Sequence, residues 1–210
     1  MAANRPLGIG LRAQKGGALV VAVEMEAGEP RILLSTAIET HEAGDRLSLE
    51  PYRVAAEVAA GVRCGVPAEA AAAVAEGRKR QERMAAEALR DVIHRLGAAG
   101  NEPIIAALLV NRAGWIADLL SYSLAWAAHV PVAELLAVRD ALRSAFSQCG
   151  VEGVELDEKS LFDLAAERLD LSPEEIESRL KALGASAGKP WRKEQRLACL
   201  AAWVAVSGPR

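Results

Sequence analysis

The sequence predicts an α/β protein in which helices cover both faces of one mixed five-stranded sheet. Its 210 residues suit a single domain, and 51% of them are hydrophobic, which is enough for a sizeable core. The chain opens with three strand-like segments joined by short turns, which predicts an antiparallel meander. Two further strand-like segments follow, each after a stretch of helical periodicity. The element order β-β-β-α-β-α-β-α therefore favours antiparallel and parallel pairs in one sheet.

The three opening strands are short and rich in valine, isoleucine and leucine. Glycines mark the turns between them, and Gly16 and Gly17 in the first turn tolerate positive φ angles. We expect these strands at 6–12, 18–25 and 31–41.

The middle of the chain alternates between turn-rich and helical composition. A turn-rich segment at 42–67 precedes a long helix at 68–97, whose apolar residues recur every three or four positions. The continuous apolar run PIIAALLV at 103–110 predicts a strand that is buried on both faces. The segment AGWIADLLSYSLAWAAH at 113–129 predicts a helix whose aromatic face packs in the core or against a second copy of the chain.

The last third of the chain predicts one more strand with helices before and after it. Ser172 and Glu175 form a capping box that opens one of these helices, which we expect to stop at Gly184. The predicted elements are a helix at 132–149, a strand at 151–156 and helices at 158–169, 172–184 and 190–206. We therefore expect one domain over 1–210, with an insertion near 42–67 and extra helices near 113–130 and 172–184.

Composition narrows the function classes. A net charge of −3 argues against nucleic-acid binding over the whole surface but leaves room for local basic patches. Cys64, Cys149 and Cys199 are widely spaced, so we expect a cytoplasmic, reducing location and no disulfide framework. Neither a secretory leader nor a membrane span is expected. The histidines share no ligand spacing with the cysteines, so no zinc site is expected.

The segment GIGLRA at 8–13 fits the dinucleotide-binding pattern G-x-G-x-x-G/A. That pattern needs a helix directly after the glycines, because the helix N-terminus holds the pyrophosphate. Here a turn and a valine-rich strand follow instead. The sequence therefore argues against a dinucleotide site.

Three motifs in the same order resemble a known family. The opening strand carries Gly8, Ile9, Lys15 and Gly17 before a run that starts at Ala18. The stretch Asp157, Glu158, Lys159 and Ser160 ends a strand before a helix, and the last helix carries Leu197, Leu200, Ala201 and Ala202. Together they resemble the ribonuclease-H-like superfamily, and within it the YqgF and RuvC-like family of Holliday-junction resolvases and nucleases. The resemblance implies a ribonuclease-H-like sheet and covers most of the chain.

The departures from that family concern its catalytic acids. The family's first-strand aspartate falls at Gly10, its last-helix aspartate falls at Ala198, and the fourth strand ends at Asn111 without a carboxylate. Of the expected acids, Asp157 remains. The family's two-magnesium chemistry needs clustered carboxylates, since Mg²⁺ takes oxygen ligands. Weak candidates for relocated acids are Glu158, Glu24, Glu39 and Glu155.

Two basic segments suggest a ligand. GRKRQER at 77–83 and GKPWRKEQR at 188–196 place cations on helix surfaces, and the second also offers an indole for stacking. The candidate nucleic-acid contacts are Lys15, Arg78, Lys79, Arg83, Lys189, Trp191, Arg192, Lys193 and Arg196. We expect a non-catalytic binding protein associated with nucleic acid, with no cofactor, no metal and no membrane partner. The alternatives are a divergent nuclease, for which Mg²⁺ would be needed, and a structural homodimer.

Overall fold

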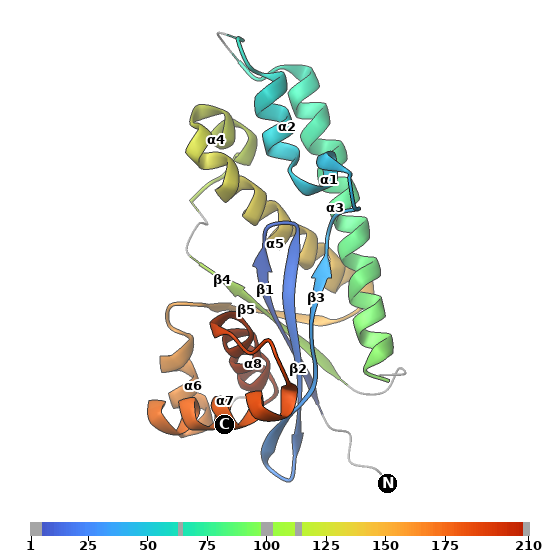
Figure 1. Ribbon diagram of the computed structural model, residues 1–210. Helices are drawn as coiled ribbons and strands as arrows, with labels where there is room; N and C mark the ends of the chain where they lie inside the picture. The colour runs from blue at the N-terminus through green and yellow to red at the C-terminus, as the bar shows by residue number, and fades with distance from the viewer. Residues whose placement is uncertain (1–5, 63–64, 98–102, 112–114, 208–210) are drawn as a thin grey trace.

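The computed structural model describes residues 6–62, 65–97, 103–111 and 115–207. Its centre is a five-stranded sheet in the order β3-β2-β1-β4-β5 (Figure 1). The strands are β1 (Leu7–Gln14), β2 (Gly17–Glu26), β3 (Glu29–Glu39), β4 (Ile104–Val110) and β5 (Glu152–Asp157). The described helices are α1 (Arg46–Leu49), α2 (Pro51–Val58), α3 (Ala68–Arg95), α4 (Leu119–Ala125), the 3₁₀ turn η1 (Ala127–His129), α5 (Val130–Cys149), α6 (Leu161–Leu169), α7 (Pro173–Ala187) and α8 (Lys193–Val206).

The sheet is mixed, which confirms the predicted architecture. Strands β1, β2 and β3 form the antiparallel meander, with Gly10 opposite Val21. Strand β4 adds parallel to β1, with Gly10 opposite Ala107, and β5 adds parallel to β4. The carboxyl ends of β1, β4 and β5 therefore meet at one edge of the sheet, which we call the strand-end edge. Strand β1 runs straight through Gly8 and Gly10, as expected for a chain without a dinucleotide loop.

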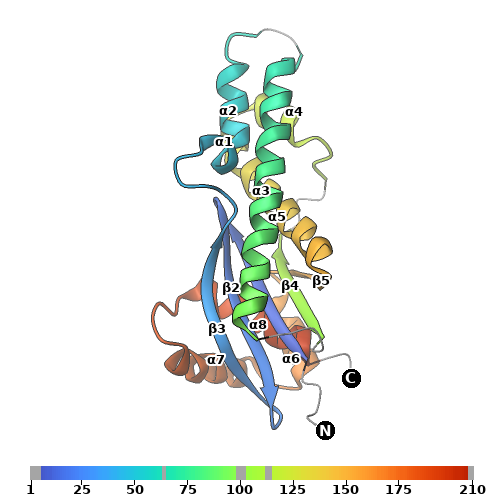
Figure 2. The same cartoon turned by 90° about the vertical axis from the view of Figure 1, so that its right-hand side faces the viewer.

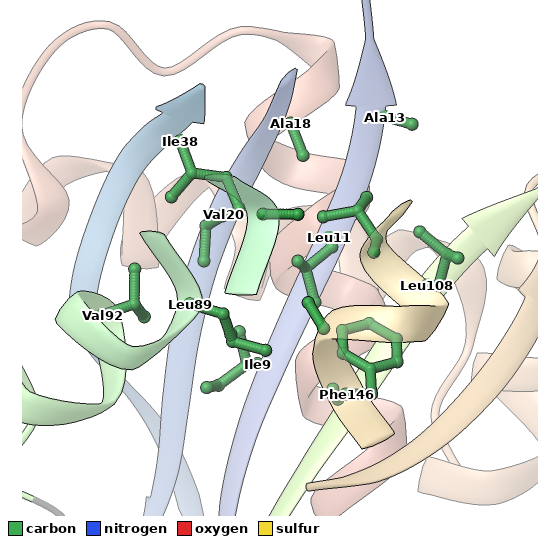
Figure 3. Packing of buried hydrophobic residues seen from close by; sticks show 14 of the residues in the cluster. Ile9, Leu11, Ala13, Ala18, Val20, Ile38, Leu89, Val92, Leu108 and Phe146 are labelled. Carbon is green, nitrogen blue, oxygen red and sulfur yellow. The ribbon is translucent and has the colours of Figure 1, made fainter. Parts of the chain in front are cut away.

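Each face of the sheet buries its own core. On one face, alternate β1 residues such as Ile9 and Leu11 pack with Leu108 against α3 and α5, where Leu89 and Phe146 contribute (Figure 3). On the other face, residues of β2 and β4 pack against α6, α7 and α8. The period of two along β1 sends Gly8, Gly10 and Arg12 toward the α8 face.

Helices also extend beyond the sheet. Helices α1, α2 and α4 stand with the first turns of α3 and α5 past the strand-end edge (Figures 1 and 2). A third core around Tyr52, Val74, Val130 and Ala137 holds this part together, and we call it the helical cap. No helix in the described ranges is long and apolar enough to cross a membrane.

The predicted helix at 113–129 is wrong in extent. Residues 113 and 114 lie outside the described part of the chain, and α4 begins only at Leu119, after Asp118 caps its first turn. The helix ends at Ala125, and the next residue, Trp126, adopts an extended backbone before η1. Trp115 and Trp126 are 74% and 70% exposed, so the expectation that this aromatic face fills the core of a monomer is also wrong.

The predicted stop at Gly184 is wrong as well. The capping box of Ser172 and Glu175 opens α7 as expected, but the helix continues to Ala187. Gly184 lies inside it, because a side chain there would collide with the Trp191 indole, whose Cδ1 atom is 2.2 Å from the ideal Cβ position. This glycine makes room for a packing contact rather than ending the helix.

Candidate functional site

Helix α8 packs backbone to backbone on β1 where the family's first catalytic acid would stand. A Cβ atom built on Gly10 would lie 1.8 Å from the carbonyl oxygen of Ala198. One helical turn further, a Cβ atom on Gly8 would lie 2.4 Å from the carbonyl oxygen of Ala202. The two glycines thus let the helix approach closely, and the position of Gly10 has no space for a carboxylate.

The next β1 residue on the same face is a cation. Arg12 donates two hydrogen bonds to Glu158, from Nε to Oε2 and from Nη2 to Oε1, both at 3.0 Å. This bidentate pair joins the end of β1 to the residue that follows β5, across the intervening β4. Glu158 is therefore committed to a guanidinium rather than to a metal-binding cluster.

The other candidate acids do not gather around Asp157. Its Oδ1 atom accepts a hydrogen bond from the Lys159 backbone N–H at 3.0 Å, in a turn after β5. Glu24 is ion-paired with Arg31 and lies opposite Leu7, at the end of the sheet away from the strand-end edge. Measured along the strands, it is roughly 20 Å from Asp157.

Two more candidate carboxylates do not complete a cluster, although Glu155 lies two residues before Asp157 on the same face of β5. Glu39 ends the outermost strand β3, and four strand spacings put it roughly 19 Å from β5. Glu155 pairs with Arg143 of α5. Among the described residues, no group of three or more histidine, cysteine or acidic side chains could hold a metal ion. The side chains at this edge do not fit the pair of magnesium ions that the family resemblance implies.

What the strand-end edge holds instead is a pocket of about 450 Å³ beneath the helical cap. We call it the edge pocket. Its walls come from the end of β1 and the β1–β2 turn, the start of α2, the first half of α5, and the residues after β4 and β5. They comprise Arg12, Ala13, Gln14, Lys15, Glu50, Arg53, Asn111, Val130, Pro131, Glu134, Leu135, Arg139, Glu158 and Lys159.

Arg139 of α5 is the most deeply buried cation of this pocket, with 4% exposure. Its Nη1 atom donates to the Asn111 Oδ1 atom at 2.6 Å, whereas its buried Nε atom has no partner among the described residues. Burial lowers the pKa of Arg139, yet a guanidinium stays protonated in a protein. The pocket wall therefore carries a buried positive charge whose described partner is a neutral amide.

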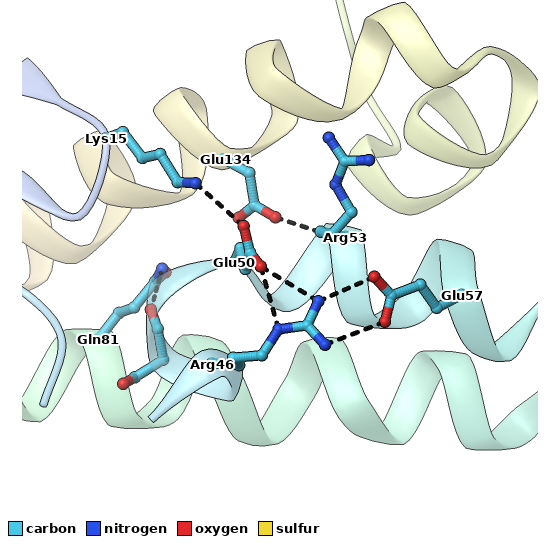
Figure 4. A network of polar contacts seen from close by, with 8 residues as sticks. Lys15, Arg46, Glu50, Arg53, Glu57, Gln81 and Glu134 are labelled. Atoms are coloured by element: carbon cyan, nitrogen blue, oxygen red, sulfur yellow. Dashed lines mark hydrogen bonds and ion pairs between the residues drawn. The ribbon is translucent and has the colours of Figure 1, made fainter. Parts of the chain in front are cut away.

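Glu134, one and a half helical turns earlier on α5, is also buried, with 5% exposure. Its Oε1 atom accepts the Arg53 backbone N–H at 2.9 Å and so caps the first turn of α2 (Figure 4). Its Oε2 atom is buried without a described partner. Burial raises the pKa of Glu134 to about 7, so the carboxyl is partly protonated at neutral pH.

Lys15 and Glu50 close the outer side of the pocket. Lys15 Nζ donates to Glu50 Oε2 at 3.0 Å, and this bond is the main cause that lowers the pKa of Glu50. Glu50 also pairs with Arg46, which in turn pairs with Glu57 (Figure 4). Lys15, a predicted nucleic-acid contact, is thus already engaged with an acid.

The predicted basic segment on α3 divides into paired and unpaired cations. Arg78 pairs with Asp140 at 2.8 Å. For Lys79 and Arg83, no ion pair to another described residue is found. The α3 segment lies on the opposite face of the sheet from α8, so the structure does not bring the two basic segments together.

The predicted segment before α8 divides in a similar way. Arg196 pairs with Glu177, and the half-buried Trp191 donates its indole N–H to the Leu180 carbonyl oxygen at 3.1 Å. Because Gly10 lies opposite Ala198 and Gly8 opposite Ala202, α8 runs antiparallel to β1. Arg192 and Lys193 therefore lie toward the strand-end edge, and both are exposed, as is Lys189.

Sequence reasoning missed Arg12, Arg53, Glu134 and Arg139. Arg12 lies in the GIGLRA segment, where attention fell on the glycines, and Arg53 carried no motif. Glu134 and Arg139 lie inside a segment whose apolar periodicity marks it simply as a helix. One available signal was that two charged residues, Glu134 and Arg139, fall on the face of the predicted helix that this periodicity buries.

Comparison with solved structures bears on the fold. Thermus thermophilus RuvC is similar to this chain with a TM-score of 0.52 and 12% sequence identity, over 94% of this chain and 92% of that chain. The chain has the RuvC fold. At this identity the likeness establishes the ribonuclease-H-like architecture predicted from the three motifs, and it leaves the function open.

Two further structures were found. T. thermophilus RuvC in complex with a Holliday junction substrate has a TM-score of 0.49 and 14% identity, over 95% of this chain and 92% of that chain. The yeast mitochondrial Holliday junction resolvase Ydc2 has a TM-score of 0.38 and 10% identity, over 98% of this chain and 83% of that chain. No family model and no curated protein matches the chain.

Proposed function

We propose that this chain is a nucleic-acid-binding protein of the RuvC fold that does not cut its ligand. The observation that carries the proposal is the contact between Gly10 and the Ala198 carbonyl, which leaves no room for the first metal-binding acid. The Arg12–Glu158 pair supports it, because a guanidinium stands where a metal cluster needs anionic ligands.

The ligand class follows from charge and position. Exposed Lys189, Arg192 and Lys193 precede or begin α8 near the strand-end edge, and exposed Lys159 follows β5 at the same edge. Cations at a helix start oppose the helix dipole, so local stability does not account for Arg192 and Lys193. A phosphate backbone along this edge would compensate them, and counterion release would drive its binding.

A divergent nuclease is the catalytic alternative. It would need further carboxylates near Asp157. Glu24 and Glu39 lie at other parts of the sheet, which argues against such a cluster. Mg²⁺-dependent cleavage of DNA or RNA by the purified chain would establish it and overturn the proposal.

A second candidate function is a structural homodimer, and exposed aromatic side chains favour it. Trp115 packs edge-on against Tyr122 with ring centroids 5.7 Å apart, and Tyr122 stacks on His129 at 3.9 Å. Together with exposed Trp126 they form an apolar surface of the kind found at protein interfaces. Sedimentation of the wild type and of Trp126→Ser distinguishes this function, since the variant would shift a dimer to monomer.

Fluorescence anisotropy with labelled four-way DNA junction, duplex DNA and RNA tests the proposal. Affinity should fall steeply between about 50 mM and 200 mM salt. The double variant Lys189→Gln/Lys193→Gln should lower the salt slope by roughly two, at about 0.9 per phosphate contact. Lys79→Gln/Arg83→Gln on the opposite face and Lys181→Gln on α7 serve as controls and should bind as the wild type does. Absence of binding at low salt, or an unchanged double variant, would overturn the proposal.

A further inference from the structure

The edge pocket has the size and construction of a small-molecule site. Its volume of about 450 Å³ falls within the range of ligand pockets, and it lies where a parallel part of a sheet ends. Two of its charged residues, Glu134 and Arg139, are 5% and 4% exposed and each has a buried polar atom without a described partner. Such groups are costly to bury unless something compensates them.

Arg139 lacks a directly bonded acid among the described residues, although the charges of Glu158 and Glu155 act on it from nearby. Glu158 is held by both arms of Arg12, Glu50 is held by Lys15 and Arg46, and Asn111 offers Arg139 only an amide oxygen. Two acids of the pocket are therefore engaged with other cations, and the third, Glu134, accepts the Arg53 backbone N–H and is partly protonated at neutral pH. An anion from solution is the group that this wall fits.

The charge count indicates how much negative charge the pocket accommodates. Five cationic side chains and three acidic ones line it, an excess of two positive charges when Glu134 is ionised and of three when it is protonated. A phosphate monoester carries between one and two negative charges at neutral pH, and its oxygens match the planar guanidinium of arginine.

The apolar part of the lining is suited to the rest of such a molecule. Val130, Pro131 and Leu135 present apolar surface on α5, the helix that also carries Arg139, and Ala13 adds to it from the end of β1. Apolar walls with a few convergent polar groups are typical of sites for small organic ligands.

We propose that the edge pocket binds a small organic phosphate monoester, with Arg139 and Lys159 holding the phosphate and the start of α5 contacting the organic body. This inference goes beyond the proposed nucleic-acid function, since it concerns a small ligand inside the edge pocket and, apart from Lys159, a different set of side chains. The phosphate could belong to a free metabolite or to the 5′ end of a strand, and the two sources share the same chemistry.

Isothermal titration calorimetry and thermal denaturation with adenosine 5′-monophosphate as the probe test the proposal. The nucleotide should bind and raise the melting temperature, whereas adenosine, which lacks the phosphate, should do neither. Lys159→Gln should weaken binding about tenfold or more, as expected for a lost charge-assisted hydrogen bond, and Lys181→Gln should leave it unchanged. Arg139→Gln should abolish binding, and Lys159→Gln, an exposed position, decides the matter if the Arg139 variant does not fold.

Competition then identifies the source of the phosphate. Displacement of the nucleotide by a 5′-phosphorylated oligonucleotide, but not by its unphosphorylated form, places a strand end in the pocket. No displacement by either supports a free small molecule. Equal binding of adenosine, no binding of the nucleotide at millimolar concentration, or an unaffected Lys159→Gln variant overturns the proposal. The Lys189→Gln/Lys193→Gln variant should bind the nucleotide normally, so failure of this site and failure of the nucleic-acid surface are separable.

Discussion

Replacing Gly10 by alanine should strongly destabilise the protein, because β1 and α8 touch at this residue. The new Cβ atom would lie 1.8 Å from the Ala198 carbonyl oxygen and 2.8 Å from its carbonyl carbon. Ordinary contacts begin near 3.4 Å, so α8 must retreat by roughly 1.6 Å or β1 must bend. The obstructing atoms are backbone, which cannot rotate away as a side chain can. We expect a loss of about 3 kcal/mol in the free energy of unfolding, at the upper end of overpacking costs.

Urea and thermal denaturation measure this loss. For a chain of this length, about 3 kcal/mol corresponds to a fall of roughly 6–12 °C in melting temperature. Gly153→Ala is a matched control in β5, because its new Cβ would lie 2.8 Å from a side-chain atom of Phe146 rather than 1.8 Å from backbone. The control should lose clearly less stability. A Gly10→Ala protein within about 0.5 kcal/mol of wild type would show that α8 does not occupy the space of the missing acid and would refute the reasoning.

Three further predictions concern stability. Between about pH 4.5 and 7 the native state of wild type holds a proton on Glu134 that the unfolded chain releases, so stability should fall by about 3 kcal/mol as pH rises through this window. Glu134→Gln should remove that part of the pH dependence in urea titrations, and an unchanged pH profile would contradict the burial of this carboxyl. Trp191→Ala should lower the free energy of unfolding by about 2 kcal/mol, because packing on Gly184 is lost. Trp191→Phe should leave nucleic-acid affinity unchanged in anisotropy measurements. Ser172→Ala should cost between about 0.5 and 2 kcal/mol in chemical denaturation, because Glu175 loses its capping partner, and a neutral effect would argue against the capping box.

Much of the fold is predictable from the sequence because local signals and topology agree. The valine-rich strands, the glycine turns and the Ser172 capping box all stand where their residues favour them. The prediction failed where tertiary contacts override local signals. Gly184 reads as a helix stop, but it is a packing position under Trp191, which lies seven residues later in the chain.

The site was harder to predict than the fold. The resemblance predicted which of the family's acids have no counterpart here, since it places two of them at Gly10 and Ala198. It did not indicate what replaces them, because Arg12 and Glu158 are 146 residues apart and meet only when β1, β4 and β5 pair. Arg139 was hidden for the same reason. Arg139 reaches Asn111 only when the sheet and the helical cap have assembled.

We propose that this chain, which has the RuvC fold, lacks a working metal site, and a cleavage assay tests this proposal most directly. Purified protein would be incubated with end-labelled four-way DNA junction and, separately, RNA, in the presence of Mg²⁺ or Mn²⁺, at protein concentrations that saturate binding. We expect the nucleic acid to remain intact while it is bound. Metal-dependent cleavage that disappears in an Asp157→Asn variant would contradict the account, because it would show that acids other than those at Gly10 and Ala198 assemble a catalytic centre.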